Sequence, residues 1–296
     1  MKKSVSLLLA GLMLCGALTG CGGNNSTAEN TDSQTAESTT GTSGAIHVVS
    51  REDGSGTRGA FVELTGVEDD NGDNTTVEAE IANRTDAVLT TVAGNEAAIG
   101  YVSLGSLNDT VKAVTVDGVE ATVDNVKSGD YTLSRPFNIA TKGEPTGVAA
   151  DFIGFIMSAD GQAIVGEDYI TVNDNAEAFT SDGSSGHITV GGSSSVSPVM
   201  EQLIEAYKAV NPNAQIDLQT SDSTSGMTGA MDGTFAIGMA SRELKDEEAA
   251  ELTGTAIALD GIAVIVNTAN TVDNLTMDQI RSIYVGETTD WSEVAE

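Results

Sequence analysis

The chain has 296 residues, with 13 Lys and Arg against 44 Asp and Glu, so its formal net charge is −31. An acidic surface of this strength repels nucleic acids and anionic lipids, so we expect no nucleic acid partner, and it favours solubility. It also repels small anions. Any anion must therefore be held by short-range hydrogen bonds in a closed cleft, because the long-range electrostatic force works against binding and is partly screened by salt.

The first 20 residues have the pattern of a bacterial lipoprotein signal. Lys2 and Lys3 precede an apolar stretch that ends in Leu18-Thr19-Gly20-Cys21. The apolar stretch is shorter than the roughly 20 residues of a membrane span, which favours a cleaved signal over an uncleaved membrane helix. Cleavage before Cys21 would leave one cysteine, better suited to lipid attachment than to a disulfide. It would also change the net charge to 11 − 44 = −33.

Residues 21–44 are almost all small or polar and predict a disordered tether. About 250 residues remain, enough for one large lobe or two modest ones. No later stretch is long and apolar enough to cross a bilayer. We expect a protein outside the cell, tied to the outer face of the membrane by lipid at Cys21.

Strands and helices alternate after the tether, which favours an α/β fold with ligand sites at the carboxyl ends of strands. β-Branched runs bounded by Gly, Asp or Asn predict strands at residues 46–50, 98–104, 111–116, 135–141, 187–191, 216–220, 235–240 and 256–267.

Helices are predicted where apolar residues recur at helical spacing. Residues 147–157 and 198–210 each carry a broad apolar face, and the second begins with Ser197 as N-cap and Pro198 at the first position. A third helix begins at Thr276, with Gln279 completing a capping box. The polar, glycine-rich stretch 174–186 reads as a linker inside the globular region.

Four hydroxyl-rich turns follow strand-like runs. Three of them precede a helix start: Asp53-Gly54-Ser55-Gly56-Thr57, Gly192-Ser193-Ser194-Ser195-Val196-Ser197-Pro198 and Ser221-Asp222-Ser223-Thr224-Ser225-Gly226; the fourth is Ala240-Ser241-Arg242. One such turn is typical of ordinary helix capping. Four together indicate neutral donors that surround a tetrahedral oxyanion, with Arg51 supplying positive charge.

The glycines also suit other ligands. Gly54-x-Gly56-x-x-Gly59, with Glu78 about 20 residues on, matches a dinucleotide fingerprint, but polar residues separate the glycines from the strand. The phosphate loop of nucleotide hydrolases is absent, since no Lys-Ser or Lys-Thr follows the glycines.

Residues for catalysis are few. His47 lies inside a predicted strand and His187 opens one, and neither has a sequence neighbour that suggests a triad. No Cys or His cluster has metal-ligand spacing, and the acidic run 68–73 reads as a solvated loop rather than a calcium site. We expect no enzyme, no catalytic residue, no metal and no cofactor.

These motifs resemble a known family, the phosphate-binding lipoproteins of bacterial phosphate ABC transporters (the PstS group). Ser50-Arg51-Glu52-Asp53-Gly54-Ser55-Gly56-Thr57-Arg58-Gly59-Ala60-Phe61 is similar to the family's most specific motif. Further similarity lies in residues 188–195, 223–226 and 238–242. The resemblance implies a type II periplasmic-binding-protein-like fold of two α/β lobes, joined by crossing strands near 135–141 and 260–267.

The order of the motifs is unusual for that family, and the chain resembles a circularly permuted member. Residues 187–296 correspond to the family's first part and residues 45–175 to its second. The resemblance implies lobe II from residues 45–134 and 263–296, and lobe I from residues 135–180 and 181–262, with the linker 174–186 joining the family's original ends.

The resemblance also implies roles for individual residues. Arg51 contacts phosphate oxygens as a bidentate fork and Asp53 orients its guanidinium. The remaining donors implied are Ser55, Gly56, Thr57, Ser194, Ser195, Val196, Thr224 and Ser241. Well-known members have an aspartate at the position of Ser241, and it accepts a proton from phosphate. A serine accepts and donates but lacks the charge that rejects sulfate.

The function implied is capture of inorganic phosphate between the lobes, with hinge closure and delivery to membrane permease subunits. Three alternatives stay open: binding of another tetrahedral oxyanion such as sulfate, a surface sensor or adhesin, and a phosphatase-like enzyme.

Overall fold

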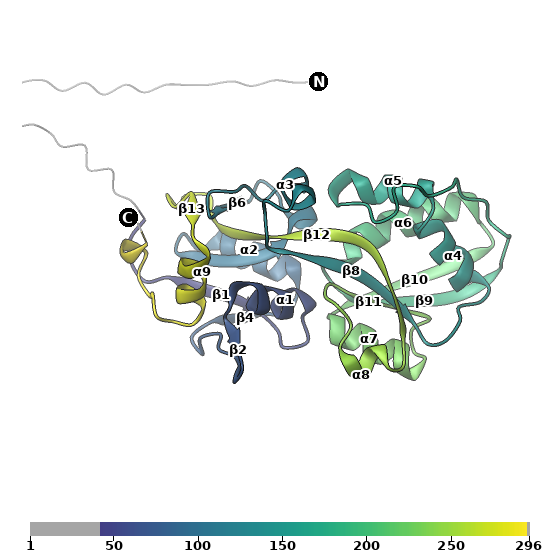
Figure 1. Ribbon diagram of the computed structural model, residues 1–296, viewed down its shortest axis with the longest axis horizontal. Helices are drawn as coiled ribbons and strands as arrows, with labels where there is room; N and C mark the ends of the chain where they lie inside the picture. The colour runs from purple at the N-terminus through teal and green to yellow at the C-terminus, as the bar shows by residue number, and fades with distance from the viewer. Residues whose placement is uncertain (1–41, 295–296) are drawn as a thin grey trace, which may run out of the picture. The chain divides into compact units, whose positions relative to one another are not determined.

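The computed structural model describes residues 42–294, so the predicted signal, the lipidation position Cys21 and most of the predicted tether lie outside the described residues. The described chain is built around a nine-stranded mixed sheet (Figure 1). Its strand order is β10-β9-β11-β8-β12-β5-β1-β4, with β6 also paired to β12.

The strands of this sheet are β1 (His47–Arg51), β4 (Glu80–Ala82), β5 (Ala98–Ser103), β6 (Val111–Ala113), β8 (Ser134–Thr141), β9 (Gly186–Ser193), β10 (Ala214–Ser221), β11 (Ile237–Ala240) and β12 (Thr253–Asn267). Two small sheets pair β2 (Glu68–Asp69) with β3 (Gly72–Asp73), and β7 (Thr115–Val116) with β13 (Asn274–Leu275).

The helices are α1 (Gly56–Thr65), α2 (Thr85–Gly94), α3 (Val123–Ser128), α4 (Val148–Ile156), α5 (Ala159–Asp168), α6 (Ser197–Val210), α7 (Ser223–Asp232), α8 (Asp246–Ala249) and α9 (Met277–Tyr284). Short 3-10 turns cover Leu104–Ser106 and Trp291–Glu293. No single helix in residues 42–294 is long and apolar enough for a membrane span. Only as a pair, bent by 57°, do α4 and α5 meet that criterion of length and composition.

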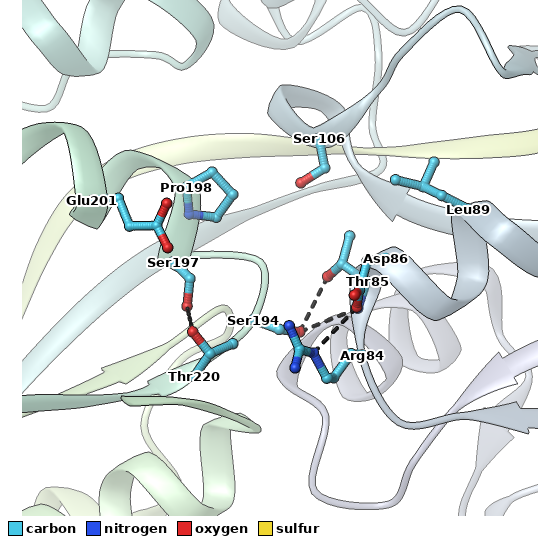
Figure 2. Close-up of a pocket in the computed structure, with 10 residues that line it drawn as sticks. All are labelled: Arg84, Thr85, Asp86, Leu89, Ser106, Ser194, Ser197, Pro198, Glu201 and Thr220. Carbon is cyan, nitrogen blue, oxygen red and sulfur yellow. Dashed lines mark hydrogen bonds and ion pairs between the residues drawn. The ribbon is translucent and has the colours of Figure 1, made fainter. Parts of the chain in front are cut away.

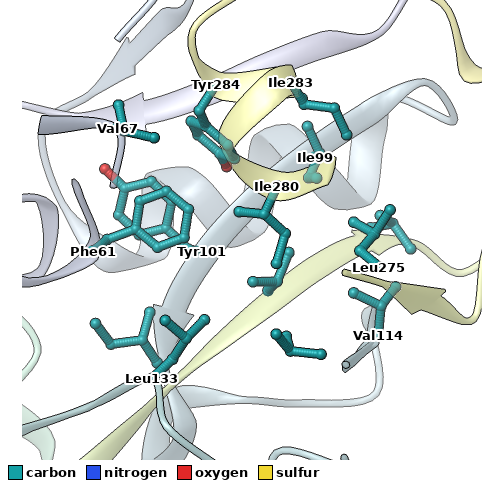
Figure 3. Close-up of a cluster of buried hydrophobic side chains, with 14 of the residues drawn as sticks. Phe61, Val67, Ile99, Tyr101, Val114, Leu133, Leu275, Ile280, Ile283 and Tyr284 are labelled. Atoms are coloured by element: carbon teal, nitrogen blue, oxygen red, sulfur yellow. The ribbon is translucent and has the colours of Figure 1, made fainter. Parts of the chain in front are cut away.

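Buried apolar side chains form separate clusters at the two ends of the sheet. One end packs Phe61 flat on Tyr101, with ring centroids 3.9 Å apart, and sets Tyr284 edge-on to Phe61 at 4.7 Å (Figure 3). The other end packs Phe152 and Tyr207 among residues of α4, α6 and the neighbouring strands. We call the first half lobe II (β1–β7, α1–α3, β13, α9) and the second lobe I (α4–α8, β9–β11).

Two antiparallel strands run from one lobe to the other, as predicted. β8 pairs with β12 from Ser134–Gly261 to Thr141–Thr253, and β12 then continues into lobe II, where it pairs with β5 (Figure 1). Long runs of β-branched and aliphatic residues in β12 suit a strand buried on both faces. The lobes therefore share one continuous hydrogen-bonded sheet.

The predicted strands are present with bounds shifted by a few residues, and the run 111–116 divides into β6 and β7. The capping box of Thr276 and Gln279 is confirmed at α9. The predicted N-cap of α6, Ser197, is wrong by one residue. Val196 occupies that position, because the backbone N–H of Val196 donates to Ser193 O and the turn closes earlier.

Residues 176–185 have no helix or strand, in agreement with the linker prediction, and a buried carboxylate holds them against lobe I. Asp151 accepts hydrogen bonds from the Ser181 hydroxyl at 2.7 Å and the Asp182 N–H at 2.9 Å. It also accepts from Tyr207 and Asn211 of α6 and its end. The linker is thus fixed to the helices that it passes.

Candidate anion-binding site

The turn after β1 presents a buried arginine. Arg51 is the last residue of β1 and is only 2% exposed. Its Nε and Nη2 donate to the two carboxylate oxygens of Glu52, each at 2.8 Å, and Nη2 also donates to Ser194 Oγ at 3.2 Å. This bidentate pair fixes the guanidinium plane while Nη1 is left for a weak contact with Thr85 Oγ1 at 3.4 Å.

Asp53 does not orient Arg51, which corrects the expectation. The side chain of Asp53 is 98% exposed and its Oδ1 lies 2.8 Å from Nη1 of Arg58. The tight turn that brings Ser55 N–H to Glu52 O directs the two successive carboxylates to different arginines. Glu52 takes the role that the resemblance gave to Asp53.

Thr57, in the first turn of α1, lies at the centre of a hydroxyl network. Its Oγ1 is fully buried and is 2.9 Å from Ser195 Oγ and 3.3 Å from Ser241 Oγ. Ser193 donates to Ser241 at 3.0 Å, and Ser223 Oγ lies 3.5 Å from it. α1 comes from lobe II and the serines from three turns of lobe I, so both lobes contribute to one polar cluster.

Thr85, which the sequence did not single out, completes this cluster. Thr85 is the first residue of α2, and its Oγ1 is 3.2 Å from Ser194 Oγ (Figure 2). The same oxygen is 3.3 Å from Ser195 Oγ. No hydroxyl-rich run precedes α2, and its N-cap residue is Arg84. The signal that could have found Thr85 is its place at a helix start directly after the short strand β4.

Arg135, a second buried arginine, was also missed. It is 3% exposed, pairs through Nη1 with the buried carboxylate of Asp260, and its Nη2 donates to Thr57 Oγ1 at 3.3 Å. Burial raises the pKa of Asp260, although the charge of Arg135 acts in the opposite direction. Burial lowers the pKa of Arg135. The two residues come from β8 and β12, the strands that cross between the lobes.

The other predicted donors lie around this cluster. Ser55 caps α1 by accepting from Arg58 N–H at 3.3 Å, and a Cβ on Gly56 would meet Ser223 Oγ at 2.4 Å. The N–H of Thr224 donates to Gly54 O at 3.1 Å, across the lobes, and its hydroxyl lies 3.4 Å from Nη2 of Arg242. The N–H of Val196 is engaged within its own turn.

A cavity of about 300 Å³ opens beside the cluster (Figure 2). Thr85 and Ser194 belong to both. The other lining residues are Arg84, Asp86, Leu89, Ser106, Ser197, Pro198, Glu201 and Thr220. The first residues of α2 and α6 meet at this cavity, so two helix N-termini with their partial positive charge face it.

The two histidines lie outside the cluster, on strands as expected. His47 pairs with Glu80 at 2.8 Å and His187 with Asp217 at 2.8 Å, all at least partly exposed. The acidic run 68–73 forms the β2–β3 hairpin, where Asp73 pairs with Arg58. Within residues 42–294, no group of three His, Cys, Asp or Glu is placed to hold a metal ion.

Comparison with known proteins identifies the family of this chain. A family model described as a PBP superfamily domain matches residues 25–160 and 177–296. The chain is 46% identical over 302 residues to phosphate-binding protein PstS 2 of Streptococcus agalactiae serotype V, covering 99% of each protein. The chain belongs to the PstS family of the PBP superfamily.

Other members of the PstS family differ in how much of them aligns. The crystal structure of a phosphate ABC transporter, phosphate-binding protein from Streptococcus pneumoniae TIGR4 matches with a TM-score of 0.69 and 46% identity, over 85% of this chain and 100% of that one. Phosphate-binding protein PstS of Bacillus subtilis is 35% identical over 134 residues, which is 44% of this chain and 42% of the relative.

Proposed function

We propose that this chain binds inorganic phosphate between lobe II and lobe I and delivers it to the permease of an ABC transporter. The observation that carries the proposal is the hydroxyl network around Thr57, in which Ser195 and Ser241 of lobe I meet a residue of lobe II at 2.9 and 3.3 Å. Full-length relatives named as phosphate-binding proteins support the choice of ligand.

The chemistry suits a tetrahedral oxyanion. Hydroxyls and helix N-termini donate hydrogen bonds without adding formal charge, and Arg51 adds a cation that is held in place by Glu52. Burial strengthens each of these hydrogen bonds because the local dielectric is low. A hinge at the crossing strands would open the lobes to admit the anion and close them around it.

Calorimetric titration of the purified protein with phosphate, arsenate and sulfate tests this proposal. We expect saturable 1:1 binding of phosphate. A protein that binds none of the three anions would rule the proposal out and would favour a sensor or adhesin role.

Selectivity between these anions depends on Ser241. Its hydroxyl has Ser193, Thr57 and Ser223 as neighbours, and no carboxylate within residues 42–294 is its hydrogen-bond partner, so this position lacks a charge that would repel a fully deprotonated anion. Binding of a sulfate-like anion is therefore the second candidate function. Competition between sulfate and phosphate in the same titration decides between a general oxyanion protein and a phosphate-selective one.

We infer that the protein binds its ligand without transforming it, as a transport protein does. The described residues near Thr57 offer hydroxyls and paired arginines, with neither histidine in contact with them. A chromogenic phosphate ester provides the check. Turnover that persists through purification and scales with protein concentration would favour the phosphatase alternative instead.

Attachment at the outer face of the membrane through lipid on Cys21 is part of the proposal. It rests on the charged, apolar and small-residue pattern of residues 1–21. Replacing Cys21 with Ala should move the protein from the membrane fraction to the soluble extracytoplasmic fraction. Retention of the Cys21→Ala protein in membranes would contradict the lipid anchor.

We also infer that the chain is a circularly permuted member of its family. A permuted order would limit alignment with differently ordered relatives to less than half of each chain, as with the Bacillus subtilis protein. It also requires the new ends to be neighbours, and Trp291 N–H donates to Gly44 O at 3.0 Å. A gene re-ordered to start at residue 187 and end at residue 174, with residue 294 joined to residue 45 by a short linker, should yield a folded, phosphate-binding protein.

A further inference from the structure

Arg135 is a buried cation whose hydrogen-bonding capacity is only partly used. Its Nη1 binds Asp260 and the carbonyl of Gly261, at 2.8 Å for the latter. Its Nε is buried without a hydrogen-bond partner among the described residues, as is Oδ1 of Asp260. Leaving donors of a buried guanidinium unpaired is costly, which is why such a group usually serves a ligand or a network.

The free side of this guanidinium faces the hydroxyl network. Nη2 of Arg135 lies 3.3 Å from Oγ1 of Thr57, and that oxygen is within hydrogen-bonding distance of Ser195 and Ser241. An anion that accepts from these three hydroxyls would lie within about 6 Å of the guanidinium. At that range an opposite charge shifts the energy of an ion substantially.

We propose that Arg135 is a second cationic residue of the anion site, positioned by Asp260, and that with Arg51 it makes the site prefer a doubly charged tetrahedral anion. This inference rests on the proposed phosphate-binding function. The two arginines contact different hydroxyls of the network, Arg51 through Ser194 and Arg135 through Thr57. Among the described residues, Arg51 pairs with Glu52 and Arg135 with Asp260, so each charge has a carboxylate partner when the site is empty.

The position of Arg135 on a crossing strand connects the anion site to the link between the lobes. Arg135 lies on β8 and its partner on β12, opposite each other at the pair Asp260–Arg135 in the register of the crossing strands. Thr57 lies on α1 of lobe II. The contact between Nη2 and Thr57 therefore joins the crossing strands to the anion site, and an anion that draws on Arg135 also fixes α1 against those strands.

The test compares three proteins by phosphate titration. Arg135→Met alone would leave Asp260 as an unpaired buried carboxylate and could unfold the chain, so the main variant is Arg135→Met with Asp260→Leu, which removes the pair together and is commonly neutral for stability. The control is Lys112→Met with Asp273→Leu, which removes the same formal charges from a more exposed ion pair with a 2.8 Å separation. Thermal unfolding verifies that all are folded.

We expect the Arg135→Met/Asp260→Leu protein to bind phosphate at least about tenfold more weakly than the wild type, and the control to bind normally. Between about pH 6 and about pH 8 a phosphate group acquires most of its second charge, so wild-type affinity should rise. That rise should be smaller without Arg135.

Equal affinity and an equal pH response in the folded double variant and the wild type would overturn the proposal and leave Arg135 with a purely structural role. Failure of the wild type to bind phosphate at all would instead overturn the proposed function. The two outcomes are distinct because the first requires a wild-type protein that binds.

Discussion

Arg51 and Glu52 are consecutive residues whose side chains form a two-point ion pair, with Nε–Oε2 and Nη2–Oε1 both at 2.8 Å. The guanidinium is 2% exposed and the carboxylate 20%, so the acidic partner lies toward solvent and the basic one toward the hydroxyl network. This geometry keeps the charge of Arg51 directed at Ser194 and Thr85.

Arg51→Ala should weaken phosphate binding by roughly 2–5 kcal/mol, because the variant loses the cation and leaves Glu52 to repel the anion. Asp53→Asn is the matched control. The Asp53 side chain is 98% exposed and pairs with Arg58, so its loss should leave the dissociation constant unchanged. Calorimetry on both proteins checks the pair; a wild-type affinity for Arg51→Ala would count against the site.

Thr57→Val should reduce phosphate affinity by about 1–3 kcal/mol, since valine keeps the shape and removes a hydroxyl that bridges Ser195, Ser241 and Arg135. The buried partners would also lose a hydrogen bond, so the melting temperature should fall as well. Thr57→Ser, which retains the hydroxyl, should recover most of the affinity. If Thr57→Val bound like the wild type, the network would not touch the ligand.

Gly56→Ala should abolish tight binding. A Cβ at this position would lie 2.4 Å from Ser223 Oγ and 2.9 Å from Ser241 Oγ, so α1 could not approach lobe I. Gly59→Ala in the same helix is the control, because its Cβ would meet nothing closer than Arg242 Cδ at 3.9 Å. We expect Gly59→Ala to bind normally and to gain about 0.5–1 kcal/mol of stability from helix propensity. Equal binding by both variants would contradict the close approach.

Asp151 should make the protein lose stability in acid. Burial raises the pKa of Asp151, but hydrogen bonds from Tyr207, the Asp182 N–H, Ser181 and Asn211 outweigh it and hold the pKa below its usual 3.8. A depressed folded-state pKa contributes stability above the unfolded value, and that contribution disappears as the pH falls through the folded value.

Urea unfolding of wild type and Asp151→Asn at neutral pH and below pH 3.8 measures this contribution. The gap in the free energy of unfolding should be largest at neutral pH and should narrow in acid. Asp109→Asn, at an exposed position, should follow the wild type throughout. A gap that stays constant with pH would show that Asp151 does not act through its charge.

Much of the fold and the core of the site could be predicted from local patterns. Arg51 ends β1, Thr57 lies in the first turn of α1, and Ser195 lies in the turn between β9 and α6, so each is placed at the carboxyl end of a strand. Their meeting across the lobes required the resemblance to a family as well, because no local pattern tells which turns face one another.

The missed residues share a physical cause. Arg135 is the second residue of β8 and contacts Thr57, 78 positions away in the chain, so its role depends on tertiary contact alone. Thr85 is the first residue of α2, and no hydroxyl-rich run precedes it in the chain. The choice between Glu52 and Asp53 depends on the direction in which two adjacent side chains leave a tight turn. Asp53 pairs with Arg58, which in turn pairs with Asp73, and these contacts form only in the folded chain.

The fifteen-residue strand β12 carries a consequence for unfolding, since it is bonded to β8 in one half of the molecule and to β5 in the other. Neither half can unfold completely while its backbone hydrogen bonds to β12 stay intact. Loss of the bonds to β8 or to β5 also loosens the part of β12 that pairs with the other strand. Denaturation of the apoprotein should therefore be a single cooperative event, despite two separate apolar interiors.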